Sequence, residues 1–489
     1  MSGISRWSPA AGRFQNRKLH DSPQHGKLRP VQLYRALFPV LLALAPAPVT
    51  AEQPATSPAP LAPFQAPAPV MDTTGEPLSI YLITVGQGDP YWTRFGHNAL
   101  WIRDRQRGTD IAYNWGLFDF NEPGFLSRFL SGNTRYWMAG FDTWDMLQVY
   151  RSENRSIDVQ ELALTPEQAR DLQQFAEWNA LPENRTYRYD YYLDNCSTRI
   201  RDAIDRVLSG QIRLATDSIL THNTYRSHTQ RLLADHAPTW GGIMLVLGQP
   251  ADNPITAWDE MFIPMLMRDH LRAVTVTDGA GGSRPLVSTE WRMLEPDRPP
   301  ERAAAPNRAW SYTTTGLLLG LLIGLLAWGA GRGGWPPVTR TAAAILLSAW
   351  SILAGAAGLV VIGMWALTHH IFMYGNENVL QVTPLSLALA LLIPLSVRSR
   401  PGPRAAYWAT LLAFTILGLS LIGFILQLLP LMNQRNGEII GLALPLHAAT
   451  AYAVWRLSHG SEPASSLSDD AHPASRPVAA VSDTGSDPG

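Results

Sequence analysis

The strongest constraint on this chain is a series of long apolar runs that begins after Trp310. The runs fall at 312–330, 341–368, 379–397, 405–429 and 438–457. Each is close to the length of about 20 apolar residues that a helix needs to cross the hydrocarbon core of a bilayer. The sequence therefore predicts an all-α membrane domain of five transmembrane helices over 312–457.

Arginines flank these runs unevenly. The first and third connecting loops and the end of the last run hold Arg332, Arg340, Arg398, Arg400, Arg404 and Arg456. The second loop, 369–378, has no Lys or Arg, and the fourth has only Arg435. Because positively charged loops stay on the cytoplasmic side, the first and third loops are expected inside. The region before the first span is then expected outside.

The N-terminal residues predict export. Lys27, Arg29 and Arg35 precede a short apolar stretch, and small residues at 49–51 suit cleavage. We predict a signal peptide over 1–51, which is either cleaved or kept as an anchor. Three further segments have the composition of linkers or, for the last, of a disordered cytoplasmic tail: 52–77, 301–311 and 458–489.

Charge and histidine spacing argue against two classes of function. Lys and Arg together number 39 and Asp and Glu number 40, so this near-neutral chain gives no case for nucleic-acid binding. His222, His228, His236 and His270 lack compact metal-ligand spacing. We therefore predict no metal site and no cofactor.

The region 78–300 predicts a soluble α+β domain. Four stretches rich in β-forming residues are expected to be strands: 79–85, 95–102, 110–116 and 155–164. Thr165, Pro166 and Gln168 form a capping-box start for a helix. Leu172, Phe175 and Ala176 give that helix its buried face. We expect a small antiparallel sheet packed against helices.

Cys196 is the only cysteine in the 489 residues, and it opens a second amphipathic helix that stops at Gly210. Apolar residues recur along this helix at three- and four-residue spacing: Ile200, Ala203, Ile204, Val207 and Leu208. Asp194 or Asn195 is the expected N-cap. A lone cysteine in an exported domain is a reactive thiol, an intermolecular bridge or an inert buried side chain. The helix N-terminus favours the first, because its unpaired N–H groups and positive dipole end stabilise a thiolate.

His97, near the start of the second expected strand, is the histidine expected to meet Cys196. A thiol nucleophile needs a base to take its proton and a third polar group to fix the tautomer of that base. Asn114, on the neighbouring expected strand, is the candidate for the third role. Both have plainer alternatives, with His97 satisfied in the core and Asn114 as a turn or sheet-edge residue.

A set of motifs, in a fixed order, resembles one bacterial family. In the soluble domain they lie at 82–84, 95–100, 113–116, 183–187 and 194–199. The segment 258–264 resembles the end of that domain, and His369-His370, Asn376-Glu377-Asn378 and Pro384 resemble a loop of the membrane region. Over about 78–400 the chain resembles the Lnb-type bacterial lipoprotein N-acyltransferases.

The order of His97 before Cys196 also resembles the circularly permuted papain-like fold of NlpC/P60 and lecithin:retinol acyltransferase relatives. The latter carry an acyl group on Cys as a thioester. A second His often follows the first in those relatives, where this chain has Asn114. The implied fold class is an α+β permuted papain-like extracytoplasmic domain followed by an all-α domain of five transmembrane helices.

The resemblance implies a ping-pong acyl transfer at the bacterial inner membrane, with the catalytic domain in the periplasm. Cys196 would take an acyl chain from a membrane phospholipid as a thioester, with His97 as base and then acid. The α-amine of diacylglyceryl-cysteine on a lipoprotein would then accept the chain. A water-shielded thioester would favour the amine over water.

Auxiliary residues follow from the same resemblance. Asn195 and Ser197 flank the nucleophile, the amides of Ser197 and Thr198 are candidate oxyanion donors, and Arg199 is a candidate phosphate contact. Four residues near the outer membrane surface are candidates for auxiliary roles, with interfacial anchoring or chain turning as the plainer alternatives: His369, His370, Asn376 and Asn378.

Two other functions remain open from the sequence. A membrane-anchored cysteine peptidase or amidase of the cell envelope would use the same nucleophile but has no need of five spans. A non-catalytic membrane sensor would need a cytoplasmic output, and the polar tail of roughly thirty residues is too short for a domain.

Overall fold

The computed structural model describes residues 77–277, 281–330, 337–398, 401–429, 432 and 434–459. The expected signal peptide, the linker up to residue 76, Arg332, Arg400 and the tail from residue 460 lie outside the described residues. From residue 77 onward the described residues belong to one compact unit.

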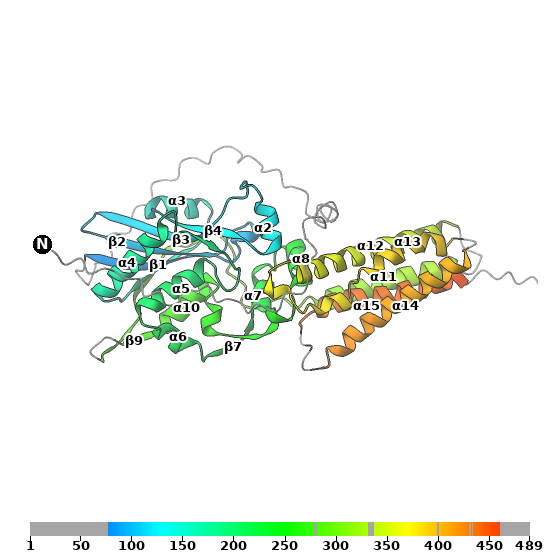
Figure 1. Cartoon of the computed structure of the whole chain (residues 1–489). Coiled ribbons are helices and arrows are strands. Elements are labelled where there is room, and N and C mark those ends of the chain that lie inside the picture. The colour runs from blue at the N-terminus through cyan, green and yellow to red at the C-terminus, as the bar shows by residue number, and fades with distance from the viewer. Residues whose placement is uncertain are drawn as a thin grey trace, which may run out of the picture. The chain divides into compact units, whose positions relative to one another are not determined.

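An antiparallel sheet forms the centre of the N-terminal domain, with strands in the order β11-β5-β1-β2-β3-β4-β6 (Figure 1). The strands are β1 (Leu78–Val85), β2 (His97–Asp104), β3 (Thr109–Leu117), β4 (Arg135–Asp142), β5 (Ile157–Leu162), β6 (Thr186–Arg188) and β11 (Val287–Leu294). The sequence predicts β1, β2, β3 and β5. The sheet is larger than expected because β4, β6 and β11 extend it at both edges.

Both faces of the central strands β1 and β2 are buried. Alternate residues of β1 and β2, such as Leu82 and Leu100, pack against α4 (Pro166–Ala180) and α5 (Cys196–Val207). Residues of the opposite parity, such as Ile83 and Trp101, pack with Leu147 of α3 (Thr143–Ser152). This alternation follows from the two-residue period of a strand.

The first turn of each main helix forms as the sequence predicts. Thr165 and Gln168 make a reciprocal capping box at the start of α4. Asn195, rather than Asp194, caps α5 and makes a second capping box with Thr198. The caps satisfy N–H groups that would otherwise lack partners, so they define Cys196 as the first residue of α5.

The segment 258–264, which resembles the end of the family's domain, lies inside the fold, within the predicted domain 78–300. Trp258, Met261 and Phe262 are buried in its core, and β11 returns afterwards to pair with β5 through Trp291 and Val159. The elements after α5 are α6 (Gln211–Thr216), β7 (Leu220–Thr224), α7 (Tyr225–Leu232), α8 (Ala237–Val246), β8 (Pro254–Thr256), α9 (Ala257–Glu260), α10 (Pro264–Ala273), β9 (Thr275–Thr277) and β10 (Ser283–Pro285). A short helix, α2 (Phe125–Ser131), precedes β4.

Within the described residues, five apolar segments are long enough to cross a membrane. They contain the helices α11 (Ala309–Ala330), α12 (Pro337–Leu367), α13 (Leu385–Ser396), α14 (Pro403–Leu426) and α15 (Gly437–His459) (Figure 1). The guanidinium of Arg340 donates to the carbonyls of Val397 and Leu457, so it caps the ends of α13 and α15.

The third span differs from the expected continuous helix over 379–397. Its regular helix α13 has 12 residues, and at about 1.5 Å per residue it is shorter than the roughly 30 Å hydrocarbon core. The 3-10 turns η4 (Ile371–Met373) and η5 (Glu377–Leu380) precede it. Irregular backbone at such a position is tolerated where protein buries it, and Asn376, Glu377 and Asn378 are buried.

Candidate active site

Cys196 is the first residue of α5 and faces the sheet at the start of β2 and the end of β3. A Cβ atom on Gly116 of β3 would lie 3.6 Å from the Cβ of Cys196, an ordinary contact distance, so the two residues are neighbours. Gly116 also has a φ of +89°, which favours glycine. The side-chain amide of Asn98 donates to the Ser197 hydroxyl over 3.0 Å and fixes the first turn of α5 to β2.

His97 begins β2, one residue before Asn98, and its ring contacts Asn114. The Nε2 of His97 lies 2.8 Å from the Oδ1 of Asn114. Since the Nδ2 of Asn114 donates to the Ala112 carbonyl over 3.0 Å, its Oδ1 faces His97 as the acceptor. Nε2 of His97 therefore carries the proton, and Nδ1 is left with a lone pair that can accept one.

The structure brings the thiol and this histidine to the same end of the sheet. The backbone N–H groups of Asn98, Ser197 and Cys196 itself act on the sulfur of Cys196. Asn98 is the residue after His97, so two segments that are about a hundred residues apart in the sequence are in contact here. His97, Asn114 and Cys196 thus come from β2, β3 and the N-terminus of α5.

Burial decides the protonation of both groups. It raises the pKa of the Cys196 thiol, and the three backbone N–H groups offset it only in part. Burial also lowers the pKa of His97 to about 4, against the hydrogen bond that His97 donates to Asn114, which raises the pKa. Both shifts favour the neutral form of each group, so the structure does not favour the stabilised thiolate that the helix N-terminus led us to expect.

Arg155 is a nearby residue that the sequence did not single out. Its guanidinium carbon lies 4.9 Å from the centroid of the Tyr150 ring, and that ring lies 6.1 Å from the His97 ring. The side chain is buried, and its Nε donates to the Gly86 carbonyl over 2.9 Å. Its positive charge lowers the pKa of both His97 and Cys196. It therefore favours the thiolate form of Cys196 and disfavours the imidazolium form of His97.

The amides expected to form an oxyanion hole are already paired. The N–H groups of Ser197 and Thr198 both donate to the Oδ1 of Asn195, over 2.8 and 2.9 Å. The Ser197 hydroxyl is buried and donates to the Met261 carbonyl over 2.6 Å. Asn195 and Ser197 hold the first turn of α5 in place rather than offering groups to a substrate.

Arg199 also has a different partner from the one expected. Its guanidinium binds both carboxylate oxygens of Asp194 and lies 4.2 Å from the centroid of the Tyr187 ring. An arginine held by a carboxylate and a ring is a poor phosphate ligand, so the expected phosphate contact is not favoured.

The candidates from the membrane region lie at contacts with the soluble domain. The backbone N–H of His369 donates to the Ser131 carbonyl, and Nε2 of His370 lies 2.9 Å from the Phe129 carbonyl. Asn376 and Asn378 donate to carbonyls at the end of α8, including that of Leu245. They cap the last turn of α8, whose carbonyls have no partner within the helix.

A second buried polar centre joins three residues that the sequence kept apart. Glu260 accepts hydrogen bonds from His228 at 3.0 Å, His270 at 2.9 Å and Asn223 at 2.8 Å. Burial works against its charge, but these hydrogen bonds outweigh burial and hold the pKa of Glu260 well below its ordinary value. Among the described residues, no group of three or more His, Cys, Asp or Glu is arranged to hold a metal ion.

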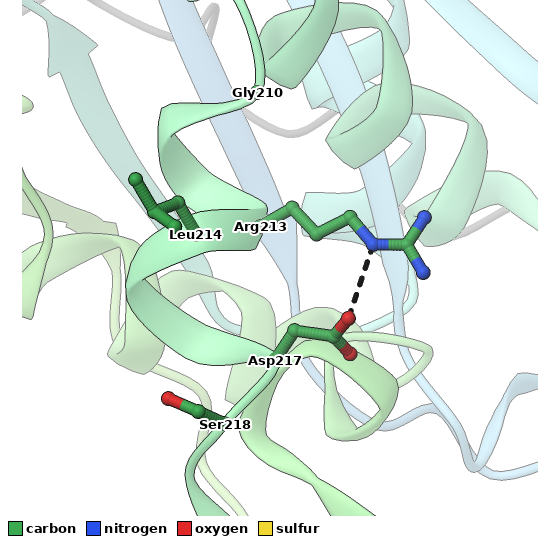
Figure 2. A pocket seen from close by; sticks show the side chains of 5 residues that line it. All are labelled: Gly210, Arg213, Leu214, Asp217 and Ser218. Carbon is green, nitrogen blue, oxygen red and sulfur yellow. Dashed lines mark hydrogen bonds and ion pairs between the residues drawn. The ribbon is translucent and has the colours of Figure 1, made fainter.

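A surface hollow on α6 is separate from these centres. Figure 2 shows it lined by Gly210, Arg213, Leu214, Asp217 and Ser218, with the Arg213–Asp217 pair bridging one side. Gly210 follows the C-terminal end of α5, whereas Cys196 begins that helix. The 12 residues of α5 separate the two by roughly 18 Å.

The fold defines a multi-pass membrane protein with a sheet-rich α+β domain before its spans. Two family models match it: the Lnb N-terminal periplasmic domain over 71–231 and the Lnb transmembrane domain over 316–455. Together they cover more than half of the chain, so the chain belongs to the Lnb family, as its motifs indicated. No curated protein and no solved structure matches it.

Proposed function

We propose that the chain is an apolipoprotein N-acyltransferase that works through a thioester on Cys196. The observation that carries the proposal is that the only cysteine begins α5 and that its sulfur is within reach of the backbone N–H of Asn98, the residue after His97, whose Nδ1 is not used by the Asn114 bond. Family membership and the membrane domain support it, since both proposed substrates are lipids of one leaflet. The proposal places the protein in the bacterial inner membrane.

In the first half-reaction, Cys196 attacks the carbonyl carbon of a phospholipid acyl ester. His97 takes the thiol proton on Nδ1 as the carbon–sulfur bond forms, because the resting pair is neutral. The ester carbon–oxygen bond then breaks, and the His97 imidazolium returns the proton to the departing lysophospholipid oxygen. Asn114 holds the imidazole in the required tautomer and accepts from its Nε2.

In the second half-reaction, the α-amine of diacylglyceryl-cysteine attacks the thioester carbon. The carbon–sulfur bond breaks, an amide forms, and the proton lost by the amine passes through His97 to the sulfur. The backbone N–H groups of Cys196 and Asn98 are the proposed oxyanion donors, because those of Ser197 and Thr198 are committed to Asn195.

Expression in a bacterium depleted of its own N-acyltransferase tests the proposal. Mass spectrometry of lipoprotein N-termini should show a third acyl chain with the wild-type protein and none with Cys196→Ala at equal membrane abundance. Leu214→Ala, an exposed position on α6, serves as the matched control and should retain activity. Triacylation by Cys196→Ala would exclude the thioester route.

The intermediate offers a second readout. With a single cysteine in the chain, any thioester must lie on Cys196, and it should appear as an acyl mass increment that hydroxylamine removes. Lipoproteins that stay diacylated while the wild-type protein is present in the membrane would instead favour the envelope peptidase or amidase.

A further inference from the structure

An exposed aromatic surface lies on the soluble domain around α2. Trp92 is 52% exposed, Phe120 58%, Leu126 50% and Phe129 45%. The ring centroids of Trp92 and Phe120 are 5.9 Å apart, and those of Phe125 and Phe129 are 6.1 Å apart. Large apolar side chains gathered on a surface indicate an interaction site.

The position of α2 relative to the spans suggests what this surface meets. The carbonyls of Phe129 and Ser131, at the end of α2, are bonded to His370 and His369. His369 follows Leu367, the last residue of α12, by two residues, which reach at most about 7 Å. A bilayer of about 40–45 Å with a 30 Å core has a headgroup layer of roughly 5–8 Å on each side. Since α12 has 31 residues, or about 46 Å, it is about as long as the whole bilayer is thick, so the end of α2 lies at the membrane surface beside the end of that span.

The charge of this segment favours insertion among lipids over electrostatic adsorption. Between Phe118 and Ser131 the only base is Arg128, and it pairs with Glu122 at 2.8 Å. The basic cluster that binds anionic lipid is thus missing from this segment, while aromatic rings are the side chains most favoured at the water–lipid boundary.

Aromatic rings also connect this surface with the nucleophile. Phe118 lies 4.9 Å from Tyr136, and Tyr136 lies 4.3 Å from Tyr189, centroid to centroid. A Cβ on Gly116 would lie 3.6 Å from Tyr189 and 3.6 Å from Cys196. The row therefore runs from the exposed rings to the residue that the proposed function makes the acyl carrier.

We propose that Trp92, Phe120, Leu126 and Phe129 form a lipid-facing surface that inserts into the outer leaflet and presents phospholipid acyl esters to Cys196. The role of this surface in presenting acyl esters rests on the proposed function, but its contact with lipid does not. The partner is the acyl-chain and headgroup boundary of the bilayer, bound without a requirement for anionic lipid.

The test uses the full chain in lipid nanodiscs and its lack of other cysteines. In a Cys196→Ala background, Leu126→Cys is labelled with a bimane fluorophore and compared with Leu214→Cys, an exposed leucine on α6 that Figure 2 shows beside the surface hollow. Lipids with a nitroxide near the headgroup should quench the label at 126 several-fold more than that at 214. Aqueous iodide should show the reverse order, in zwitterionic and anionic discs alike.

Equal access of iodide to both labels would overturn the proposal, because the surface would then face water. A label at 126 that neither quencher reaches would also overturn it, since a protein partner or a second copy would then cover the surface. Because the background lacks the nucleophile, these outcomes do not depend on whether acyl transfer occurs.

A second measurement separates lipid engagement from chemistry. The triple variant Trp92→Ser, Phe120→Ser, Leu126→Ser should lose roughly tenfold or more of its rate on long-chain donor in vesicles, given the transfer energy of the apolar groups removed. Its rate on a monomeric short-chain phospholipid should stay within about twofold of wild type. Leu214→Ser is the matched control, and equal losses on both donors would contradict the inference.

Discussion

Two histidine centres in one domain, one around the half-buried His97 and one around the buried Glu260, have similar side chains but differ in their hydrogen bonding. At His97 the partner is a neutral amide, and the Asn114 bond leaves the other ring nitrogen unused. At Glu260 a carboxylate is shared by His228 and His270, with Asn223 as a third donor. The second centre has its charge satisfied from several sides and is suited to holding α7, α9 and α10 together.

The two centres differ in whether hydrogen bonds offset the effect of burial on the pKa values. Burial lowers the pKa of His97 to about 4 and raises that of Cys196, so both groups of the first centre favour their neutral forms. Hydrogen bonds overcome burial at Glu260 and keep it charged. Groups whose pKa values are shifted because burial is not compensated are typical of functional sites. A buried network in which every polar group has a hydrogen-bond partner contributes to folding.

Removal of His97 is the sharpest test of this contrast and carries the largest expected effect. His97→Ala should reduce acyl transfer by about 10²- to 10⁴-fold, the usual contribution of a general base, while the folded protein persists. Thioester formation on Cys196, followed by mass spectrometry, measures the loss. A His97→Ala variant that forms the thioester at the wild-type rate would contradict the role of His97 as the general base.

Loss of Glu260 should show the opposite pattern. Glu260→Ala leaves the buried His228 and the half-buried His270 without their carboxylate, and breaking such a network costs about 3 kcal/mol of stability. Thermal unfolding of the purified protein should show the decrease, and activity per folded molecule should remain close to wild type. An unchanged Tm together with lost activity would make this centre part of the catalytic site.

The two centres should also change the free energy of unfolding over different pH ranges. The unfolded chain protonates His97 near pH 6.5 and the folded protein near 4, so the unfolded state holds more protons in that window. Stability should therefore fall as pH falls from about 6.5 towards 4. In His97→Gln this part of the decrease should be absent, while the loss from Glu260, which begins near its ordinary pKa of 4.5, should remain. Identical pH profiles for both proteins would contradict the burial of His97.

The smallest effect is expected at the surface hollow. Arg213 and Asp217 form an exposed pair one helical turn apart, at 3.2 Å. Arg213→Ala should change stability by at most about 0.5 kcal/mol, because solvent screens such pairs, and it should leave acyl transfer unchanged. A large loss of activity would show that the region beside α6 serves the reaction.

The sequence predicted features that depend on neighbouring residues. The capping residues of α4 and α5, the stripe of Ile200 and Ile204, and the apolar runs of the spans depend on patterns a few residues long. By contrast, β11 joins β5 across more than a hundred residues, and its pattern gives no sign of a partner. The sequence did not predict the 3-10 turns that interrupt the third span, because hydropathy does not distinguish such turns from α-helix.

For the candidate site, the sequence by itself determined that the one thiol begins a helix and that His97 and Asn114 stand on successive strands. Only the tertiary structure decided which His97 nitrogen is free, that Asn195 occupies the amides of Ser197 and Thr198, and that Asp194 holds Arg199. It also decided that thiol and imidazole rest neutral. The physical reason is that helix caps act over one turn, whereas desolvation depends on every element packed around a group.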